Sequence, residues 1–446
     1  MSTTAKSPEH SSSADTRRAI LNTLKGSSGN LVEWYDVYIY TVFASYFEAQ
    51  FFAPEDANST IYIYAIFAVT FLMRPVGAWY FGRFADRHGR RTALIVSVTL
   101  MAGCSFVIAI MPTRATIGVF AAVVLILCRL VQGFATGGEY GTSATYMSEA
   151  ATRERRGFFS SFQYVTLIGG HVLAQFTLLI MFAFLTEDQV RDWGWRIPFA
   201  IGGLGALVVM WIRRTMDESL SAEQLAEGRR SSAGSLRTLF TEYRKPLILC
   251  FLITMGGTIA FYTYSVNAPA VIKSAYKDDA LTATWINLIS LIFLMLLQPL
   301  GGLLSDRIGR KPMLVGFGVG GVVYTYFLIT YLPLTKNPFL SFLLVAVGYV
   351  IITGYTSINA IVKAELFPFH IRALGVGLGY ALANSIFGGT SPVVYQVAKS
   401  ANQVGLFIAY VTVCIALSLL VYIFALRNKS ETALDAEQGF AYQPVR

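Results

Sequence analysis

The chain has 446 residues, of which 54% are hydrophobic and only 14% are charged, with a formal net charge of +9. Soluble globular proteins carry about 25% charged residues, so the composition excludes an ordinary soluble fold and indicates a protein embedded in a lipid bilayer. The excess of basic residues does not predict a nucleic-acid partner, because these residues fall in alternate loops rather than on one soluble surface.

Apolar runs recur along the chain, and a run of about 20 residues crosses a hydrocarbon core about 30 Å thick. The runs lack the alternating pattern of barrel strands, so each is predicted to be a helix that satisfies its own backbone hydrogen bonds. We predict an all-α membrane protein of twelve transmembrane helices in two six-helix bundles. The spans are expected at residues 30–51, 60–82, 92–112, 117–145, 157–185, 196–212, 246–272, 282–304, 313–333, 339–364, 372–397 and 404–426.

Polar segments separate these spans and set their expected orientation. Basic residues such as Arg83 and Arg213 gather in alternate loops, and the positive-inside rule assigns such loops to the cytoplasm. Both chain termini are then cytoplasmic. The expected division is a cytoplasmic N-terminal tail at residues 1–28, a first bundle at 29–212, a cytoplasmic linker at 213–245, a second bundle at 246–427 and a cytoplasmic C-terminal tail at 428–446.

A loop motif occurs twice. The pattern Gly-x-x-x-Asp-Arg-x-Gly-Arg begins at Gly82 after the second span and again at Gly302 after the eighth. A Glu and Arg pair also recurs with one spacing after the fourth and tenth spans. This repeat predicts two related halves that rock against each other around a central site, although a basic loop that only sets topology is the alternative. The expected gating residues are Gly82, Asp86, Arg87, Gly89, Arg90, Glu149, Arg156, Asp306, Arg307, Arg310, Glu365 and Arg372.

Two arginines lie inside predicted spans, Arg74 in the second and Arg129 in the fourth. An ionisable group at this depth costs several kcal/mol, so each marks a functional site by default. Two guanidinium groups facing a cavity suit a dicarboxylate, because each can hold a carboxylate through two parallel hydrogen bonds. We therefore expect a small anionic metabolite as partner. The alternatives are snorkelling for Arg74 and a structural ion pair with Glu139 or Glu33 for Arg129.

Three carboxylates in the spans, Glu33, Asp36 and Glu139, are the candidate proton carriers. The alternative is that they only neutralise the arginines. His171 is a further candidate, although a lone intramembrane histidine is more often an interhelical contact. Coupling through a proton requires no cofactor. The four cysteines lie in separate spans without metal-type spacing, so we expect neither a disulfide nor a metal site.

Neutral polar side chains inside the spans are candidate donors to a substrate, although each also suits a contact between helices. Lys363 near the end of the tenth span either contacts substrate in one conformation or extends its ammonium to the membrane interface. The neutral candidates are Tyr38, Gln163, Tyr164, Tyr262, Asn267, Tyr355, Asn359 and Asn384.

Several motifs carry a family resemblance. The duplicated loop motif resembles the signature of the major facilitator superfamily, and residues 129–138 (Arg-Leu-Val-Gln-Gly-Phe-Ala-Thr-Gly-Gly) resemble its second motif. Residues 28–36 (Ser-Gly-Asn-Leu-Val-Glu-Trp-Tyr-Asp) and 193–199 (Trp-Gly-Trp-Arg-Ile-Pro-Phe) are similar to the metabolite:proton symporter branch. Further stretches within 137–149, 161–170 and 363–379 are most similar to members of that branch that carry α-ketoglutarate.

The resemblance implies a secondary active transporter that works by alternating access in a bacterial inner membrane, as a monomer. It implies proton-coupled symport of a small di- or tricarboxylate, with α-ketoglutarate first. Citrate, another organic acid or a zwitterionic compatible solute fits the same fold.

Other function classes lack their sequence features. A channel needs a filter-type loop or a charged ring, a sensor needs a sizeable soluble domain, and an enzyme needs a nucleophile, base and orienting group together. The sequence shows none of these, so we predict that the chain is not an enzyme.

Overall fold

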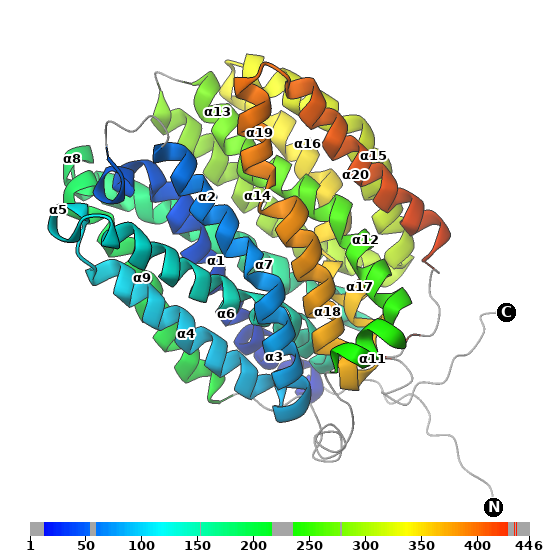
Figure 1. Cartoon of the computed structure of the whole chain (residues 1–446). Helices are drawn as coiled ribbons and strands as arrows, with labels where there is room; N and C mark the ends of the chain where they lie inside the picture. Colours follow the sequence, from blue (N-terminus) through cyan, green and yellow to red (C-terminus); the bar gives the residue numbers. More distant parts are fainter. Residues whose placement is uncertain are drawn as a thin grey trace, which may run out of the picture.

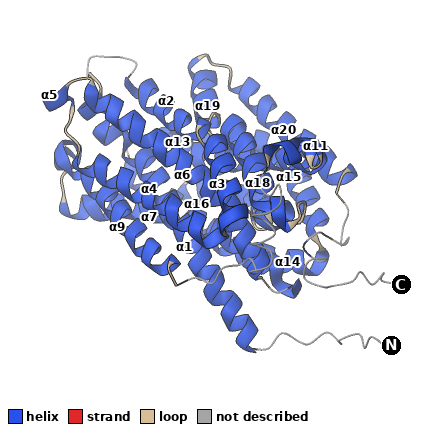
Figure 2. Cartoon of the chain, turned by 60° about the horizontal axis from the view of Figure 1, so that its bottom comes forward, coloured by secondary structure: helices blue, strands red, loops and turns tan. Residues whose placement is uncertain are grey.

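The structure is a computed structural model that describes residues 13–53, 59–151, 153–215, 235–276, 279–426, 432 and 434. Within this part of the chain the regular elements are all helices, and Figures 1 and 2 show them packed side by side as long rods. Both predicted tails lie partly outside the described residues, as does most of the predicted linker.

The first half runs from α1 to α9, drawn from blue to green-cyan in Figure 1. Its long helices correspond to predicted spans, with α2 and α3 together forming the second. The elements are α1 (Ser13–Phe51), α2 (Ser59–Leu72), α3 (Arg74–His88), α4 (Arg90–Ile110), α5 (Arg114–Ile117), α6 (Phe120–Ala150), η1 (Arg153–Arg155), α7 (Arg156–Phe184), α8 (Glu187–Gln189), η2 (Val190–Gly194) and α9 (Arg196–Arg213).

The second half runs from α11 to α20, drawn from green to red. Two of its spans contain a π-helical turn, η3 and η5. The elements are α11 (Leu236–Thr241), α12 (Arg244–Phe261), η3 (Tyr262–Asn267), α13 (Ala268–Ala275), α14 (Ala280–Ile308), α15 (Arg310–Tyr331), η4 (Leu332–Leu334), α16 (Pro338–Thr356), α17 (Asn359–Ala364), α18 (Phe369–Ala383), η5 (Asn384–Gly388), α19 (Ser391–Ser400) and α20 (Val404–Phe424).

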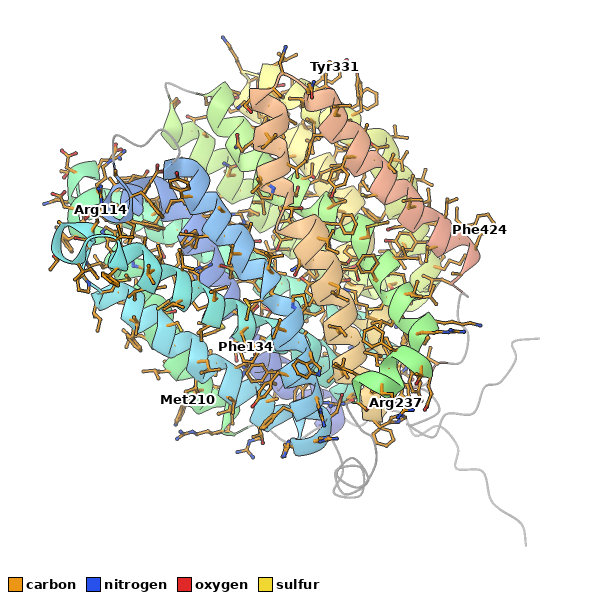
Figure 3. All side chains as sticks on the ribbon, in the orientation of Figure 1. Arg114, Phe134, Met210, Arg237, Tyr331 and Phe424 are labelled. Carbon is orange, nitrogen blue, oxygen red and sulfur yellow. The ribbon has the colours of Figure 1, made fainter. Side chains whose placement is uncertain are left out.

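Each of the twelve predicted spans coincides with one of these helices or with two or three consecutive ones. Ten stretches of the described residues are long and apolar enough to cross a membrane. The first and eleventh spans fall outside that group, and in the first span the acidic side chains Glu33 and Asp36 lower the mean hydropathy of α1. The outer surface of the spans is apolar. Figure 3 shows Phe424 projecting outward from α20, and this side chain is 82% exposed, as expected of a lipid-facing residue.

The first helix begins before the predicted span. Helix α1 already begins at Ser13, so residues 13–28 are helical and continuous with the helix of the first span. The reason is local, because residues 13–25 contain no glycine or proline and include several good helix formers. Hydropathy locates the start of the apolar run, at residue 30, but it does not locate the start of the helix, at Ser13.

The two halves touch through two equivalent pairs of helices. Helix α3 packs against α18, and α7 packs against α14 (Figure 1). In terms of spans, the second packs against the eleventh and the fifth packs against the eighth. The internal repeat makes the second span equivalent to the eighth and the fifth equivalent to the eleventh, so the two contacts are equivalent. Within the halves, α1 packs against α7 and α9, and α20 packs against α12 and α15.

Glycines allow the backbones of the two halves to meet closely. A Cβ atom added at Gly82 would lie 2.8 Å from the Cα of Leu374, and one added at Gly302 would lie 2.5 Å from the carbonyl oxygen of Gly157. Both positions begin the duplicated motif. The second motif glycine, Gly89 in the first copy, has a φ of 101° and turns the chain from α3 into α4.

Candidate functional site

Arg74 lies buried between the halves as the first residue of α3, just after the break from α2, and Pro75 follows it in the first turn. Its side chain is stacked rather than paired. The guanidinium carbon lies 3.9 Å from the ring centroid of Phe71 and 5.1 Å from that of Trp34. Its Nε and Nη2 atoms meet no hydrogen-bond acceptor among the described residues. A buried guanidinium with unused donors is prepared to bind an anion.

Glu33 of α1 supplies a negative charge near Arg74. The side chain is 2% exposed, and its Oε2 atom has no hydrogen-bond donor in the described part of the chain. Arg74 attracts this carboxylate electrostatically, but the two groups do not form an ion pair within 4 Å. Glu33 is therefore a buried acid with one carboxylate oxygen, Oε2, that no described neighbour holds.

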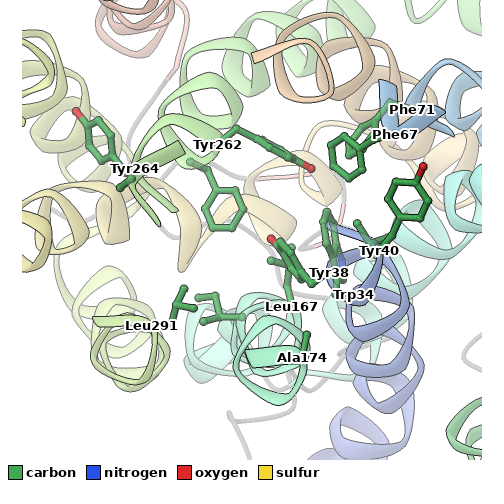
Figure 4. Packing of buried hydrophobic residues seen from close by; sticks show 14 of the residues in the cluster. Trp34, Tyr38, Tyr40, Phe67, Phe71, Leu167, Ala174, Tyr262, Tyr264 and Leu291 are labelled. Atoms are coloured by element: carbon green, nitrogen blue, oxygen red, sulfur yellow. The ribbon is translucent and has the colours of Figure 1, made fainter. Parts of the chain in front are cut away.

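Neutral groups from both halves complete this site. Tyr38 comes from α1, Tyr262 from η3 and Asn384 from η5. Figure 4 shows the hydroxyl groups of Tyr38 and Tyr262 projecting into the region between the halves. The two hydroxyls and both atoms of the Asn384 amide lack hydrogen bonds of normal geometry to any described residue, although Tyr262 lies close enough to Arg74 and Asn384 to interact with both.

We call Glu33, Tyr38, Arg74, Tyr262 and Asn384 the central cluster. Unsatisfied buried polar atoms are rare and costly in proteins, so a group of them gathered between the two halves indicates a place where ligand atoms complete the bonds. The π-helical turns explain the position of Tyr262 and Asn384, because such turns displace side chains and often mark functional sites. The contact between the Ser385 hydroxyl and the Phe71 carbonyl, 2.5 Å long, fixes η5 beside α2.

Arg129 belongs to a separate cluster inside the first half. Its Nη1 atom donates to Asp36 at 3.3 Å and to Gln132 at 2.9 Å, and its guanidinium stacks on Tyr40 at 4.4 Å. Ser105 donates to the same Asp36 carboxylate at 2.5 Å. The predicted partners for a structural ion pair, Glu139 and Glu33, are thus wrong, because α1 turns Asp36 toward α6 and Glu33 toward the interface.

Glu139 also has a basic partner, which the sequence had assigned to topology alone. Arg213 at the end of α9 is fully buried and forms an ion pair with Glu139, and Ser97 donates to the same carboxylate at 3.0 Å. Arg213 therefore stabilises the first half rather than lying in a cytoplasmic loop. Of the three candidate proton carriers, Asp36 and Glu139 are held by arginines and Glu33 is not.

The predicted gating residues meet at one end of the molecule, which we call the motif end. Asp86 accepts from Arg90 and from the backbone amides of Ala373 and Leu374 in α18, at 3.3 and 3.2 Å. Asp306, its equivalent, accepts from the amides of Gly157 and Phe158 in the first turn of α7, at 2.8 and 2.9 Å. Each half thus contacts backbone amides of a helix in the other half, and the first turn of α7 is a position that favours a carboxylate.

Ion pairs strengthen this contact. Glu149 accepts from Arg372 at 2.9 Å and from Arg90 at 3.4 Å, and Glu365 lies 3.7 Å from Arg310. The remaining predicted gating residues differ in exposure, since Arg156 is buried, Arg87 is partly buried and Arg307 is exposed. The motif end is therefore closed in this structure by backbone contacts, shared carboxylates and arginines.

The sequence of the chain is similar to those of known membrane transporters. The family described as "Sugar (and other) transporter" matches residues 23–233 and 213–440. This chain belongs to that family, within the major facilitator superfamily. It is 43% identical over 410 residues to the alpha-ketoglutarate permease of Escherichia coli K12, covering 92% of this chain and 94% of that protein. It is 32% identical over 376 residues to the citrate-proton symporter of Klebsiella pneumoniae, covering 83% of each.

A solved structure shares the fold of this transporter. The proton:xylose symporter XylE bound to 6-bromo-6-deoxy-D-glucose superposes with a TM-score of 0.78 at 18% identity, covering 96% of this chain and all of that one. The predicted twelve-helix fold is therefore confirmed, as are the prediction of a membrane transporter and the prediction that the chain is not an enzyme.

Of the other predicted site residues of the transporter, His171 contacts the central cluster, whereas Gln163 makes its hydrogen bonds elsewhere in the first half. His171 stacks on Tyr38, with ring centroids 3.9 Å apart, and so lies directly behind it. Gln163 donates to Asn30 at 3.2 Å and accepts from Ser143 at 3.2 Å. Gln163 therefore joins helices within the first half, which was its alternative interpretation.

Two asparagines of the second half make defined contacts. Asn267 donates to Ser391 at 3.3 Å, within that half. Asn359 crosses the interface and donates to the hydroxyl groups of Tyr140 and Tyr164, at 2.8 and 3.3 Å. Tyr140 was not among the predicted site residues, because a tyrosine after Glu139 in a Gly-rich stretch carries no charge to mark it. Tyr355 is buried nearby, and its hydroxyl has no hydrogen-bond partner among the residues described.

Removing Arg129 is expected to destabilise the transporter rather than to alter its substrate site. Arg129→Met would leave Asp36 buried without its counter-ion, a change that costs about 3–5 kcal/mol. The double variant Arg129→Met with Asp36→Leu removes both charges and should recover most of the lost stability. The measurement is the thermal unfolding midpoint of purified protein in detergent. A single variant as stable as the unmodified protein would show that this ion pair does not hold the first half together.

A larger side chain at Gly82 is expected to hold the motif end open, because Gly82→Val places methyl groups where the Leu374 backbone lies. The readout is maleimide labelling of Cys250, which is fully buried near this end, in a background with the other three cysteines replaced by alanine. We expect labelling at least several-fold faster than in the same background with Gly82. Gly103→Val is the matched control, since a Cβ there meets nothing within 4 Å. Equal rates in both variants would contradict the closing role of Gly82.

Proposed function

We propose that this transporter carries a small dicarboxylate together with protons by alternating access, with α-ketoglutarate as the first candidate. The observation that carries the proposal is the buried Arg74, whose Nε and Nη2 donors have no acceptor in the described structure. A guanidinium fork matches a carboxylate in geometry and charge. The 43% identity to the E. coli alpha-ketoglutarate permease supports the choice of cargo.

Each residue of the central cluster has a role in this proposal. Arg74 binds one carboxylate of the substrate, and Tyr38, Tyr262 and Asn384 donate to its remaining oxygens. Glu33 carries the proton. When a substrate carboxylate occupies Arg74, a second buried negative charge would repel it unless Glu33 is protonated. Substrate and proton therefore enter the closed site together, without a cofactor.

Alternating access then depends on the motif end. While that end is closed, substrate reaches the central cluster from the opposite side, and separation of α3 from α18 and of α7 from α14 opens the second path. We place the motif end in the cytoplasm, with both chain termini, because of its basic residues. The transporter then works as a monomer in a bacterial inner membrane.

Uptake into proteoliposomes tests the cargo. Labelled α-ketoglutarate is offered with and without an inward proton gradient, and with unlabelled succinate, citrate or glycine betaine as competitors. We expect accumulation only with the gradient, blocked by unlabelled α-ketoglutarate. Failure to take up α-ketoglutarate would overturn the cargo assignment, and direct uptake of a labelled competitor would move it to that compound.

A further inference from the structure

Lys363 of α17 is fully buried, and its ammonium forms no ion pair with any carboxylate that the structure describes. Its Nζ atom donates one hydrogen bond, to the hydroxyl of Tyr140 at 3.1 Å. The interpretation that its ammonium extends to the membrane interface is wrong for this conformation, because the side chain turns into the contact between the halves. A buried positive charge therefore remains here without a negative partner.

Three tyrosine rings surround this ammonium. Nζ lies 4.3 Å from the ring centroid of Tyr380, 5.0 Å from that of Tyr140 and 6.0 Å from that of Tyr355. The rings of Tyr140 and Tyr380 stack with centroids 3.5 Å apart. We call these three residues the tyrosine cage. Ring faces attract a cation but do not neutralise it, and an uncompensated charge inside a membrane protein marks a functional position.

The cage lies between the central cluster and the motif end. Tyr380 interacts electrostatically with Arg74 and Glu33, so the cage adjoins the central cluster. Glu365, two residues beyond Lys363, already belongs to the motif end. The contact also crosses between the halves, because Tyr140 belongs to α6 and Lys363 to α17. Opening the motif end would part these two residues and expose the ammonium to a substrate.

We propose that Lys363 is the second carboxylate-binding group of the transporter. In the conformation open at the motif end it binds the distal carboxylate of a substrate whose first carboxylate is held by Arg74. The proposal rests on the proposed function and adds the basis of selectivity: an acid with one carboxylate can satisfy only one of the two cations. In the closed conformation the tyrosine cage holds the same ammonium in place of the substrate.

The test compares selectivity in Lys363→Gln, Lys363→Arg and Tyr140→Phe. Each purified variant is placed in proteoliposomes, and two constants are measured: the KM for labelled α-ketoglutarate and the inhibition constant of pyruvate, which has one carboxylate. For Lys363→Gln we expect the KM to rise about 10- to 100-fold, with little change for pyruvate. Lys363→Arg should restore most of the affinity. Tyr140→Phe removes the hydrogen bond but keeps the charge, so its ratio of the two constants should match that of the unmodified transporter.

Each outcome has one meaning. An unchanged ratio in Lys363→Gln, or an equal loss in Tyr140→Phe, would overturn the proposal and make Lys363 a structural contact between the halves. Unmodified transporter that does not carry α-ketoglutarate would instead contradict the proposed function. In that case the same variants are measured with labelled citrate, whose several carboxylates make the same demand on Lys363, and with labelled glycine betaine. Betaine as the transported compound would overturn the proposal as well, since it has a single carboxylate.

Discussion

Arg74→Ala is expected to weaken substrate binding strongly while the protein still inserts and folds. The guanidinium forms no ion pair with another residue of the described structure, so its removal leaves no strongly paired partner behind. Truncating one member of a buried charged contact costs about 2–5 kcal/mol, which corresponds to roughly 30- to 5,000-fold in affinity. Arg74→Lys should recover only part of this, because an ammonium keeps the charge but lacks the planar fork.

The measurement is equilibrium binding of labelled α-ketoglutarate to purified protein, with size-exclusion chromatography to verify the fold. Arg191→Ala is the matched control, because it removes an arginine of which 47% of the side chain is exposed and whose ion-pair partner is the surface residue Glu187. We expect that control to bind normally. Affinity within about threefold of the unmodified protein for Arg74→Ala would remove Arg74 from the substrate site.

Glu33→Gln is expected to separate substrate exchange from proton-driven accumulation. The glutamine keeps the shape of a protonated carboxyl but cannot release a proton, so substrate should still exchange across the membrane while the gradient no longer concentrates it. We expect accumulation to fall to the level reached without a gradient. Counterflow of labelled for unlabelled substrate should stay within a few-fold of the unmodified rate.

The two other acids provide the comparison. Asp36 and Glu139 are each held by an arginine, so Asp36→Asn and Glu139→Gln should lower the yield of folded protein before they affect coupling. Exchange and accumulation are measured in the same proteoliposome preparations for all three variants. Gradient-driven accumulation by Glu33→Gln at the normal level would place the proton site elsewhere.

The sequence predicted the helices well and singled out the residues of the duplicated motif, because both depend on local patterns. Span length follows from the thickness of the bilayer. The two copies of the duplicated motif show which residue of one half is equivalent to which residue of the other. Asp86 and Asp306 were both expected to act at the gate, and the structure places them in equivalent contacts with the opposite half. The sequence could not show that Asp86 accepts hydrogen bonds from amides of α18 and Asp306 from amides of α7, because these contacts depend on how the two halves pack.

The charges inside the spans were only partly predictable. Hydropathy indicates the depth of a residue but not the direction in which its helix turns it. Glu33 and Asp36 are three residues apart, yet one faces the interface and the other pairs with Arg129. Arg213 follows an apolar run and therefore resembled a loop residue, although it is buried against Glu139.

The tyrosine cage around Lys363 shows the same limit. A lysine near the end of a span suits an interfacial position, and no local pattern indicates that tyrosines from α6 and α18 surround it. The π-helical turns that place Tyr262 and Asn384 also leave no clear mark in the sequence, since a single extra residue in a turn does not alter the hydropathy.

The most direct test of coupled dicarboxylate transport is proton movement itself. Proteoliposomes containing a pH-sensitive dye are given external α-ketoglutarate without any initial gradient, and the internal pH is followed. Coupled symport predicts internal acidification that starts with substrate addition, that saturates with its concentration and that is absent in Arg74→Ala and Glu33→Gln. Entry of labelled α-ketoglutarate without acidification would contradict it.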